Sequence, residues 1–131
     1  MTADSPRHVL IVDDEQPVAD TLSLVFQSKG YSVTVAYDAE SALVLSQTLP
    51  PDIVISDIML PGMNGIQFAI LMHETYPNCR VILLSGHPAT ADVIVDAEAH
   101  GHIFELLPKP YHPSELLARV SAVPLPTNQS G

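Results

Sequence analysis

The sequence predicts an α/β fold in which helices cover both faces of a doubly wound, five-stranded parallel sheet. Short apolar runs alternate along the chain with amphipathic stretches of helical spacing. Most of these runs are apolar on both faces, as strands are when helices cover both sides of a parallel sheet. The 131 residues suffice for one ordinary domain. No apolar run approaches the ~20 residues needed to cross a bilayer.

The expected strands are short and rich in branched apolar residues. They are His8–Val12, Tyr31–Val35, Asp52–Ser56, Arg80–Ser85 and His102–Leu107. The second alternates between apolar and polar residues, which is typical of an edge strand.

Helices are expected between these strands and after the last one. They are Pro17–Lys29, a helix capped by Asp38 that runs through Leu49, a helix capped by Asn64 that runs to about Met72, Ala89–His100, and Pro113–Val120. Pro17 suits a first helical turn and Gly30 a C-terminal stop. The side chains of Asp38 and Asn64 can accept hydrogen bonds from amides of a first turn. The crossovers between parallel strands should be right-handed.

Composition and charge restrict the classes of partner. The formal net charge is −10, with only five Lys and Arg residues, which argues against direct binding to nucleic acid or to an anionic membrane surface. The single cysteine, Cys79, has no partner for a disulfide or a metal site, so we expect a buried thiol in a reducing, cytoplasmic location. We expect flexible ends at residues 1–7 and 123–131, on either side of one domain at residues 8–122.

Polar side chains follow four of the five expected strands, at the edge of the sheet where parallel α/β folds bind ligands. Asp13 and Asp14 follow the first strand, Asp57 the third and Lys109 the fifth, while Ser85 ends the fourth. We therefore expect these side chains to meet in one crevice.

Three carboxylates in one crevice repel one another unless a divalent cation neutralises them. Hard oxygen ligands without His or Cys favour Mg²⁺. We expect Asp14 and Asp57 to be direct ligands, Asp13 to act through water, and the backbone carbonyl of Met59 to complete the shell.

A carboxylate can accept a phosphoryl group and form an aspartyl phosphate. The transferred group spreads negative charge over its equatorial oxygens, so the site must hold cations and hydrogen-bond donors in place. Mg²⁺, the ammonium of Lys109 and the hydroxyl of Ser85 would supply them.

The motifs at these strand ends resemble those of response regulator receiver domains. They are LIVDDE, DIVISDIMLPGMNG, VILLSG and LPKP, and the resemblance covers about residues 7–122. It implies a flavodoxin-like sheet with strand order 2-1-3-4-5, and a cis peptide bond before Pro110.

The resemblance also implies a role for each polar residue. Asp57 is the phosphoacceptor, Asp13 and Asp14 organise magnesium, Ser85 is the switch hydroxyl, and Lys109 contacts the phosphoryl group. The phosphodonor would be a histidine kinase or a phosphotransfer protein. The output would be altered binding to a downstream protein, with no enzymatic activity beyond slow loss of the domain's own phosphoryl group.

No output domain follows residue 122, so we expect a single-domain type. Two alternatives stay open: a phosphohydrolase with an aspartyl nucleophile, and a scaffold that is never phosphorylated. Haloacid-dehalogenase-like phosphatases place a second acid two residues after a nucleophile on the first strand. Here Asp13 and Asp14 are adjacent, and Glu15 lies two residues after Asp13.

Two positions depart from the family pattern. Leu106 occupies the position three before the lysine, where the family usually has an aromatic residue, and Phe104 lies two residues earlier. Met59, two residues past the acceptor, has no group that orients a water molecule. We expect slow hydrolysis of the phosphorylated form, and a switch that passes through residues 85–87 and the helix after them.

Overall fold

The structure is a computed structural model of the whole chain, and it describes residues 7–86, 101 and 104–121. Five parallel strands form one sheet in the order β2-β1-β3-β4-β5. The strands are β1 His8–Val12, β2 Ser32–Ala36, β3 Ile53–Asp57, β4 Arg80–Ser85 and β5 Glu105–Pro108. The predicted fold class and strand order are confirmed.

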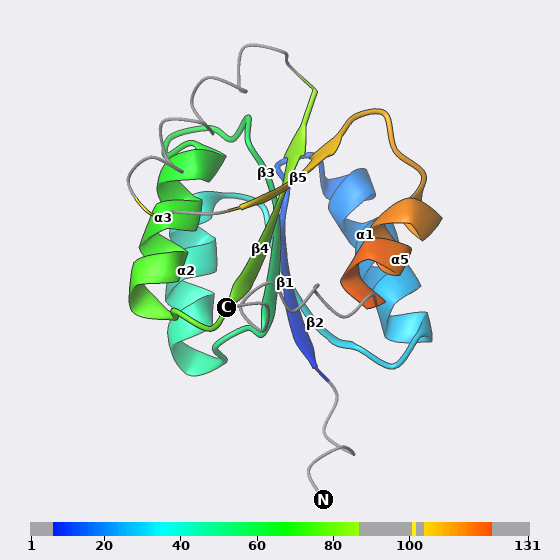
Figure 1. Cartoon of the computed structure of the whole chain (residues 1–131), viewed down its shortest axis with the longest axis horizontal. Helices are drawn as coiled ribbons and strands as arrows, with labels where there is room; N and C mark the ends of the chain where they lie inside the picture. Colours follow the sequence, from blue (N-terminus) through cyan, green and yellow to red (C-terminus); the bar gives the residue numbers. More distant parts are fainter. Residues whose placement is uncertain (1–6, 87–100, 102–103, 122–131) are drawn as a thin grey trace, which may run out of the picture.

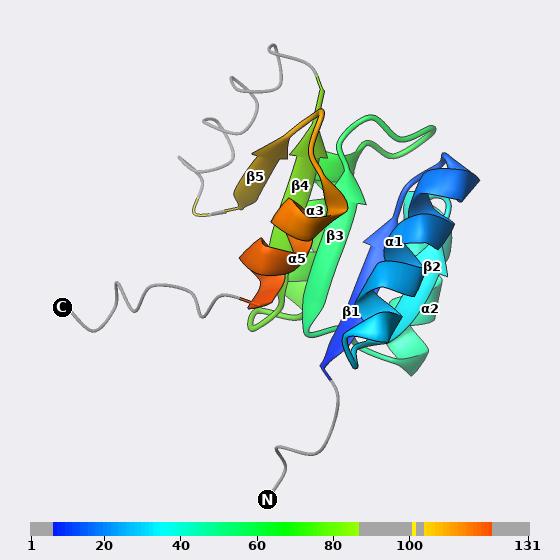
Figure 2. The ribbon, with the colours of Figure 1, turned by 90° about the vertical axis from the view of Figure 1, so that its right-hand side faces the viewer.

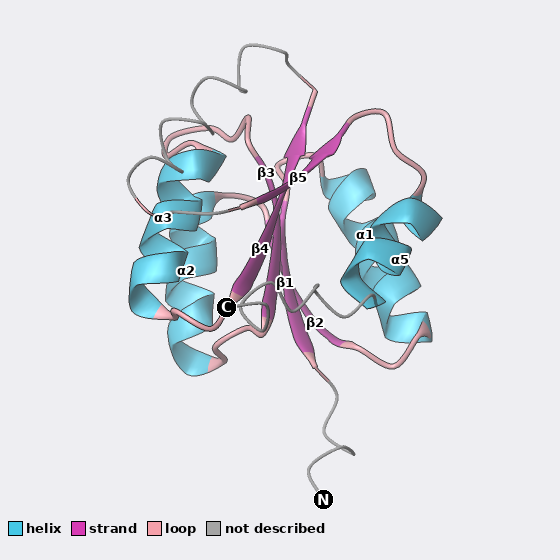
Figure 3. Ribbon diagram, in the orientation of Figure 1, coloured by secondary structure: helices cyan, strands magenta, loops and turns pink. Residues whose placement is uncertain are grey.

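Helices cover both faces of the sheet (Figures 1 and 3). α1 Gln16–Ser28 and α5 Pro113–Ser121 lie on one face, and α2 Ala39–Thr48 and α3 Gly65–Thr75 lie on the other. Figure 2 shows the face with α1 and α5 toward the viewer. The helix expected over 89–100 lies outside the described residues, as do nearly all of the expected flexible ends. Among the described helices, none is long and apolar enough to cross a membrane.

The alternation of side chains along β1 divides the core into two layers. Leu10 and Val12 pack toward α2 and α3, where Phe68 and Met72 of α3 meet them. Val9 and Ile11 pack toward the opposite face against residues of α1 and α5. All residues of β1 and β3 are buried, as expected of central strands in a sheet covered on both sides.

The predicted helix caps are confirmed at Asp38 and Asn64. The Asp38 side chain accepts a hydrogen bond from the Ser41 amide at 2.6 Å. Asn64 and Gln67 form a reciprocal capping box at the start of α3. These caps fix where α2 and α3 begin, just beyond the carboxyl ends of β2 and β3.

The last strand was predicted wrongly at its ends, since β5 runs over Glu105–Pro108 and not His102–Leu107. Its ladder with β4 begins where Glu105 pairs with Ile82 and ends where Pro108 pairs with Ser85. Phe104 therefore precedes the strand. Pairing with a neighbour determines the ends of a strand at the sheet edge, and an apolar run does not reveal that pairing. The cis peptide bond between Lys109 and Pro110 is confirmed.

One arginine connects three elements at the amino-terminal edge of the sheet. Arg80, at the start of β4, pairs with Glu105 at the start of β5. Its guanidinium also donates to the carbonyls of Arg119 and Val120 at the end of α5, at 2.8 and 3.2 Å. This bonding covers carbonyl groups that a helix leaves unpaired at its C-terminus.

Candidate functional site

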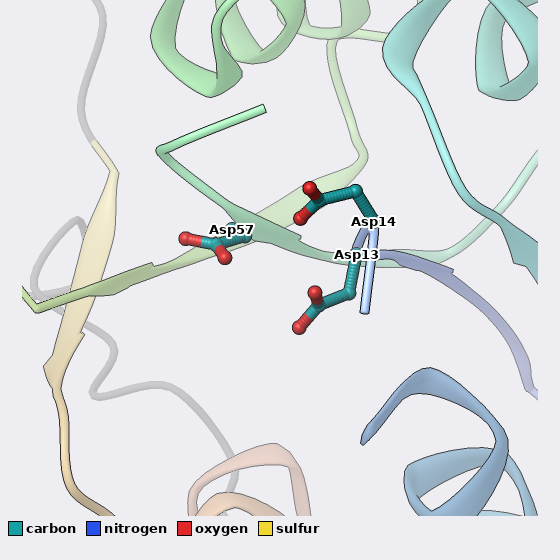
Figure 4. Close-up of side chains that lie close together, drawn as sticks. All are labelled: Asp13, Asp14 and Asp57. Atoms are coloured by element: carbon teal, nitrogen blue, oxygen red, sulfur yellow. The ribbon is translucent and has the colours of Figure 1, made fainter. Parts of the chain in front are cut away.

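The predicted site residues meet at the carboxyl edge of the sheet. β1 ends beside Asp13 and Asp14, β3 ends at Asp57, and β4 ends at Ser85. One carboxylate oxygen from each of Asp13, Asp14 and Asp57 can be chosen so that all lie within 4.8 Å of one another. Figure 4 shows Asp13 and Asp14 leaving the end of β1 on opposite sides, with Asp57 next to them. Asp13 lies on the side of α1.

Asp13 is the most deeply buried carboxylate of the cluster. Its side chain is fully buried. One oxygen, Oδ1, accepts a hydrogen bond from the Glu15 amide at 2.9 Å. The other, Oδ2, is buried without a hydrogen-bond partner among the described residues. Burial raises the pKa of Asp13, and the charge of Asp57 adds to this effect, while the Glu15 amide opposes it.

This donor set fits a divalent cation. A buried carboxylate oxygen that lacks a partner is costly, and a cation beside it removes that cost. The three carboxylates supply hard oxygen ligands, which suit Mg²⁺. The metal prediction for Asp13, Asp14 and Asp57 thus agrees with the geometry. The carbonyl of Met59 as a fourth ligand stays a prediction.

Lys109 binds the predicted phosphoacceptor directly. Its Nζ donates to Asp57 Oδ2 at 2.9 Å, and the Asp57 side chain is nearly buried. Burial alone would lower the pKa of Lys109. The hydrogen bond to Asp57 and the charges of Asp57, Asp13 and Glu15 outweigh it, so the pKa of Lys109 is raised. Lys109 is therefore held in its cationic form beside the carboxylate.

The second oxygen of Asp57 is also bonded. The Met59 amide donates to Asp57 Oδ1 at 3.2 Å, while the Met59 side chain is 64% exposed. Both carboxylate oxygens are thus oriented, one by an ammonium and one by a backbone amide.

Ser85 is buried at the end of β4, one residue beyond Leu84, which pairs with Asp57. Its carbonyl accepts a hydrogen bond from the Lys109 amide at 2.7 Å. Ser85 thus lies at the carboxyl edge between the strands that carry Asp57 and Lys109. Its role as the switch hydroxyl stays a prediction. His87, which lies at the rim of the predicted site in sequence, is outside the described residues.

The sequence did not reveal the contact between the start of α3 and the backbone of Asp57. Gly65 begins α3 and packs so closely against β3 that a Cβ atom there would lie 2.2 Å from the Asp57 carbonyl oxygen. Its amide donates to the Ile58 carbonyl at 2.9 Å. The only sequence signal was the glycine that follows the Asn64 cap. The first turn of α3 therefore rests on the backbone of Asp57.

Leu106 stands where the family usually has an aromatic residue, and Phe104 lies two residues before it. Leu106 is half-buried and packs against the core layer of α2 and α3. Phe104 is 6% exposed, and its ring lies 4.9 Å from that of His73 on α3. Phe104 is thus already buried in this structure.

The sequence model of the response regulator receiver domain matches residues 9–121. The chain belongs to this family. The receiver domain is 34% identical over 116 residues to the DNA-binding response regulator MtrA of Mycolicibacterium smegmatis, covering 88% of the chain and 50% of the relative. It therefore spans about half the length of the curated relatives it matches. The MtrA protein of Mycobacterium leprae gives the same identity and coverage.

Solved structures of receiver domains share the fold. The CheY-like receiver domain protein of Methanospirillum hungatei superposes with a TM-score of 0.80 at 25% identity, over 88% of this chain and 91% of that one. The chemotaxis response regulator CheY4 of Vibrio cholerae superposes with a TM-score of 0.76 at 30% identity, over 88% and 97%. The chain is thus a receiver domain of two-component signalling.

Proposed function

We propose that this receiver domain accepts a phosphoryl group on Asp57 from a histidine kinase or a histidine phosphotransfer protein, with Mg²⁺ held by Asp13, Asp14 and Asp57. One observation carries the proposal. The Asp57 carboxylate shares a crevice with the Lys109 ammonium and with two more carboxylates. One of these, Asp13, has a buried oxygen without a hydrogen-bond partner in the part of the chain that the structure describes. A divalent cation together with the Lys109 ammonium would balance the three carboxylates, and an anionic phosphoryl group could then enter beside them.

In the transfer step, an oxygen of Asp57 attacks phosphorus and the bond from phosphorus to the donor histidine breaks. The electron pair goes to that ring nitrogen. Because the other ring nitrogen carries a proton, the imidazole that leaves is neutral. Lys109 Nζ, now bonded to Asp57 Oδ2, is placed to move its hydrogen bond to a phosphoryl oxygen. When bound, Mg²⁺ supplies positive charge that allows a further anion to enter a crevice of carboxylates.

Incubation with acetyl phosphate and Mg²⁺ tests the proposal. We expect intact mass to increase by one phosphoryl group in the wild type. EDTA and Asp57→Asn should each abolish the increase, while Asp20→Asn, on the exposed side of α1, should not. Phosphorylation of Asp57→Asn to the same extent as wild type would contradict the assignment.

The same preparation separates the alternatives. A phosphohydrolase would turn over p-nitrophenyl phosphate repeatedly, and the rate would depend on Asp57 or Asp13. A scaffold of the unphosphorylated kind would gain no mass with any donor. A single stoichiometric phosphoryl group without turnover is the result that our proposal requires.

We further propose that the phosphorylated domain is not an efficient phosphatase toward itself. The exposed thioether of Met59 offers no hydrogen bond to a water molecule behind the phosphoryl group. Orientation or general-base help is worth roughly 10² or more in rate. Met59→Asn should therefore lose phosphate faster than wild type, whereas Met63→Asn, in the same loop, should not. Equal rates in wild type and Met59→Asn would remove this argument.

The proposed output is altered binding to another protein. The relatives named above are DNA-binding response regulators, and the chain matches only part of their length. The low content of Lys and Arg predicts that this chain itself does not bind nucleic acid, and this stays a prediction.

A further inference from the structure

A cavity of about 720 Å³ lies beside the acidic cluster on the face of the sheet covered by α1 and α5. It separates the first half of α1 from the segment that joins β5 to α5. Its volume falls in the range of roughly 300–1,000 Å³ that is usual for small-molecule sites. No residue of the proposed phosphotransfer step other than Lys109 lines it.

One end of the cavity is continuous with the acceptor site. Lys109 lines the cavity and binds Asp57 Oδ2 at 2.9 Å. Glu15 also lines it, and its amide bonds Asp13. Asp13 lies on the α1 side of β1 (Figure 4), and residues of α1 line the cavity. A phosphoryl group between Asp57 and Lys109 would therefore have the cavity as its neighbour on the α1 side.

The other end of the cavity is apolar. Pro17, Val18 and Leu22 of α1 face Tyr111 and Pro113 across it. Tyr111 follows Lys109 by two residues in the segment that joins β5 to α5, and it is partly buried. Burial, together with the charges of Asp13 and Asp57, raises the pKa of Tyr111 to about 12. The phenol thus stays neutral and belongs to the apolar wall.

We infer that this cavity receives the organic part of a small acyl phosphate donor, and that it favours donors with an apolar acyl group larger than acetyl. The inference rests on the proposed phosphorylation of Asp57. The donor's phosphoryl group, a dianion, would meet Lys109 and the metal site. Its hydrocarbon part would leave water for the wall of Val18, Leu22 and Tyr111.

The chemistry balances without a further reactant. An oxygen of Asp57 bonds to phosphorus, and the bond from phosphorus to the acyl oxygen breaks. The electron pair leaves with the carboxylate product, so no proton has to be supplied. Because the apolar acyl group stays in the cavity through the step, its burial stabilises the bound donor and the transition state alike, and it raises kcat/KM without raising kcat.

The test compares benzoyl phosphate with acetyl phosphate as donors in the presence of Mg²⁺, by initial rates of mass increase. The ratio of the two rates is measured in wild type, in Val18→Asp, and in Thr21→Phe, which fills the cavity from an exposed position of α1. Val44→Asp, on α2 outside the cavity, is the matched control. The benzoyl-to-acetyl ratio of each variant is compared with that of wild type. The difference in intrinsic reactivity between the donors cancels in this comparison, and so does the effect of an added charge on the dianionic phosphoryl group that both donors share.

We expect the benzoyl-to-acetyl ratio to fall about tenfold in Val18→Asp and Thr21→Phe, as for the loss of one apolar subsite, and to be kept in Val44→Asp. An unchanged ratio in both cavity variants would overturn the inference and leave Asp57 phosphorylation intact. Failure of both donors to label wild type would overturn the proposed function as well.

A second measurement is independent of turnover. In benzoylphosphonate the phosphorus is bonded directly to the acyl carbon, so the compound cannot transfer its phosphoryl group. It should shift the amide resonances of Thr21, Leu22 and Tyr111. It should leave those of α2 unchanged. If it shifts no resonance of the cavity in wild type, the cavity does not receive such donors.

Discussion

At the scale of single residues, Gly65 shows how a site depends on a residue that has no chemistry of its own. A Cβ atom at this position would lie 2.2 Å from the Asp57 carbonyl oxygen and 2.7 Å from the Ile58 Cα atom. Both are backbone atoms, so no side chain can move aside. Substitution must shift either α3 or the end of β3.

We expect Gly65→Ala to lower the free energy of unfolding by about 2 kcal/mol, the usual scale of overpacking, although alanine is the better helix former. It should also slow the phosphorylation of Asp57, because the acceptor moves relative to Lys109. Urea denaturation and the rate with acetyl phosphate measure the two effects.

Gly86→Ala is the matched control, since a Cβ atom there would meet only the Lys109 side chain, at 3.5 Å. Stability of Gly65→Ala equal to that of the control would contradict the close packing. Normal phosphorylation in a destabilised Gly65→Ala would show that the contact supports the fold and not the acceptor.

The sequence predicted the identity of the site residues better than their surroundings. Asp13, Asp14, Asp57, Ser85 and Lys109 could be placed together because the carboxyl ends of parallel strands share one edge. The clash at Gly65 and the apolar wall at Tyr111 depend on distances between segments far apart in the chain. No local pattern of residue types encodes those distances.

At the scale of elements, β1 and β2 are linked by a buried histidine as well as by their backbone ladder. His8 is 6% exposed, and its ring lies 2.9 Å from Ser32 Oγ and 2.7 Å from Thr34 Oγ1. Burial lowers the pKa of His8, and the charge of Asp52 only partly offsets this.

The sign of the pH dependence follows from this lowered pKa. Below the ordinary value of 6.5, the unfolded chain binds a proton at His8 more readily than the folded one. The free energy of unfolding should therefore fall as the pH drops below 6.5, with a slope of up to about 1.4 kcal/mol per pH unit for one proton. His8→Val should reduce this slope, as measured by urea denaturation between neutral and mildly acidic pH. Identical slopes in both proteins would contradict a buried neutral His8.

The ends of the elements were predictable to different degrees. The strands before β5 begin and end within one residue of the prediction. The central strands β1, β3 and β4 are almost wholly apolar, and the edge strand β2 alternates between apolar and polar residues, so both patterns are local. α3 continues to Thr75, beyond the predicted Met72, and the Tyr76 amide still bonds the Met72 carbonyl. The error in β5 has another cause, since its start depends on pairing with β4.

At the scale of the whole molecule, the chain has a net charge of −10, and three of its carboxylates meet where the site needs a cation. Mg²⁺ at ~100 times its dissociation constant should add about 2.7 kcal/mol to the stability of the folded state. We expect Asp13→Asn to remove most of this gain. Without metal, the same substitution should raise the melting temperature, because it removes a buried carboxylate whose Oδ2 has no hydrogen-bond partner among the described residues.

Thermal melts with and without Mg²⁺ measure both effects. Glu74→Gln, which removes one negative charge from the exposed side of α3, is the control and should keep the full response to Mg²⁺. A full response in Asp13→Asn would exclude Asp13 from the metal site.

The conformational switch is also a property of the whole domain. Phe104 is already buried against His73, and Leu106 has neither a ring nor a hydroxyl to reorient. With the beryllofluoride complex as a mimic of the phosphorylated state, we expect large NMR shifts in residues 85–95 and small ones at Leu106 and Phe104. A change of the Phe104 rotamer on binding would show instead that the aromatic switch has moved along the chain.

The bonds of Arg80 restrict the relative motion of three elements. They fasten the starts of β4 and β5 to the end of α5 at the edge opposite the acids. We therefore expect these bonds to hold the starts of β4 and β5 against the end of α5 when the acceptor site changes. The structural change that follows phosphorylation should then be largest at the carboxyl edge of the sheet.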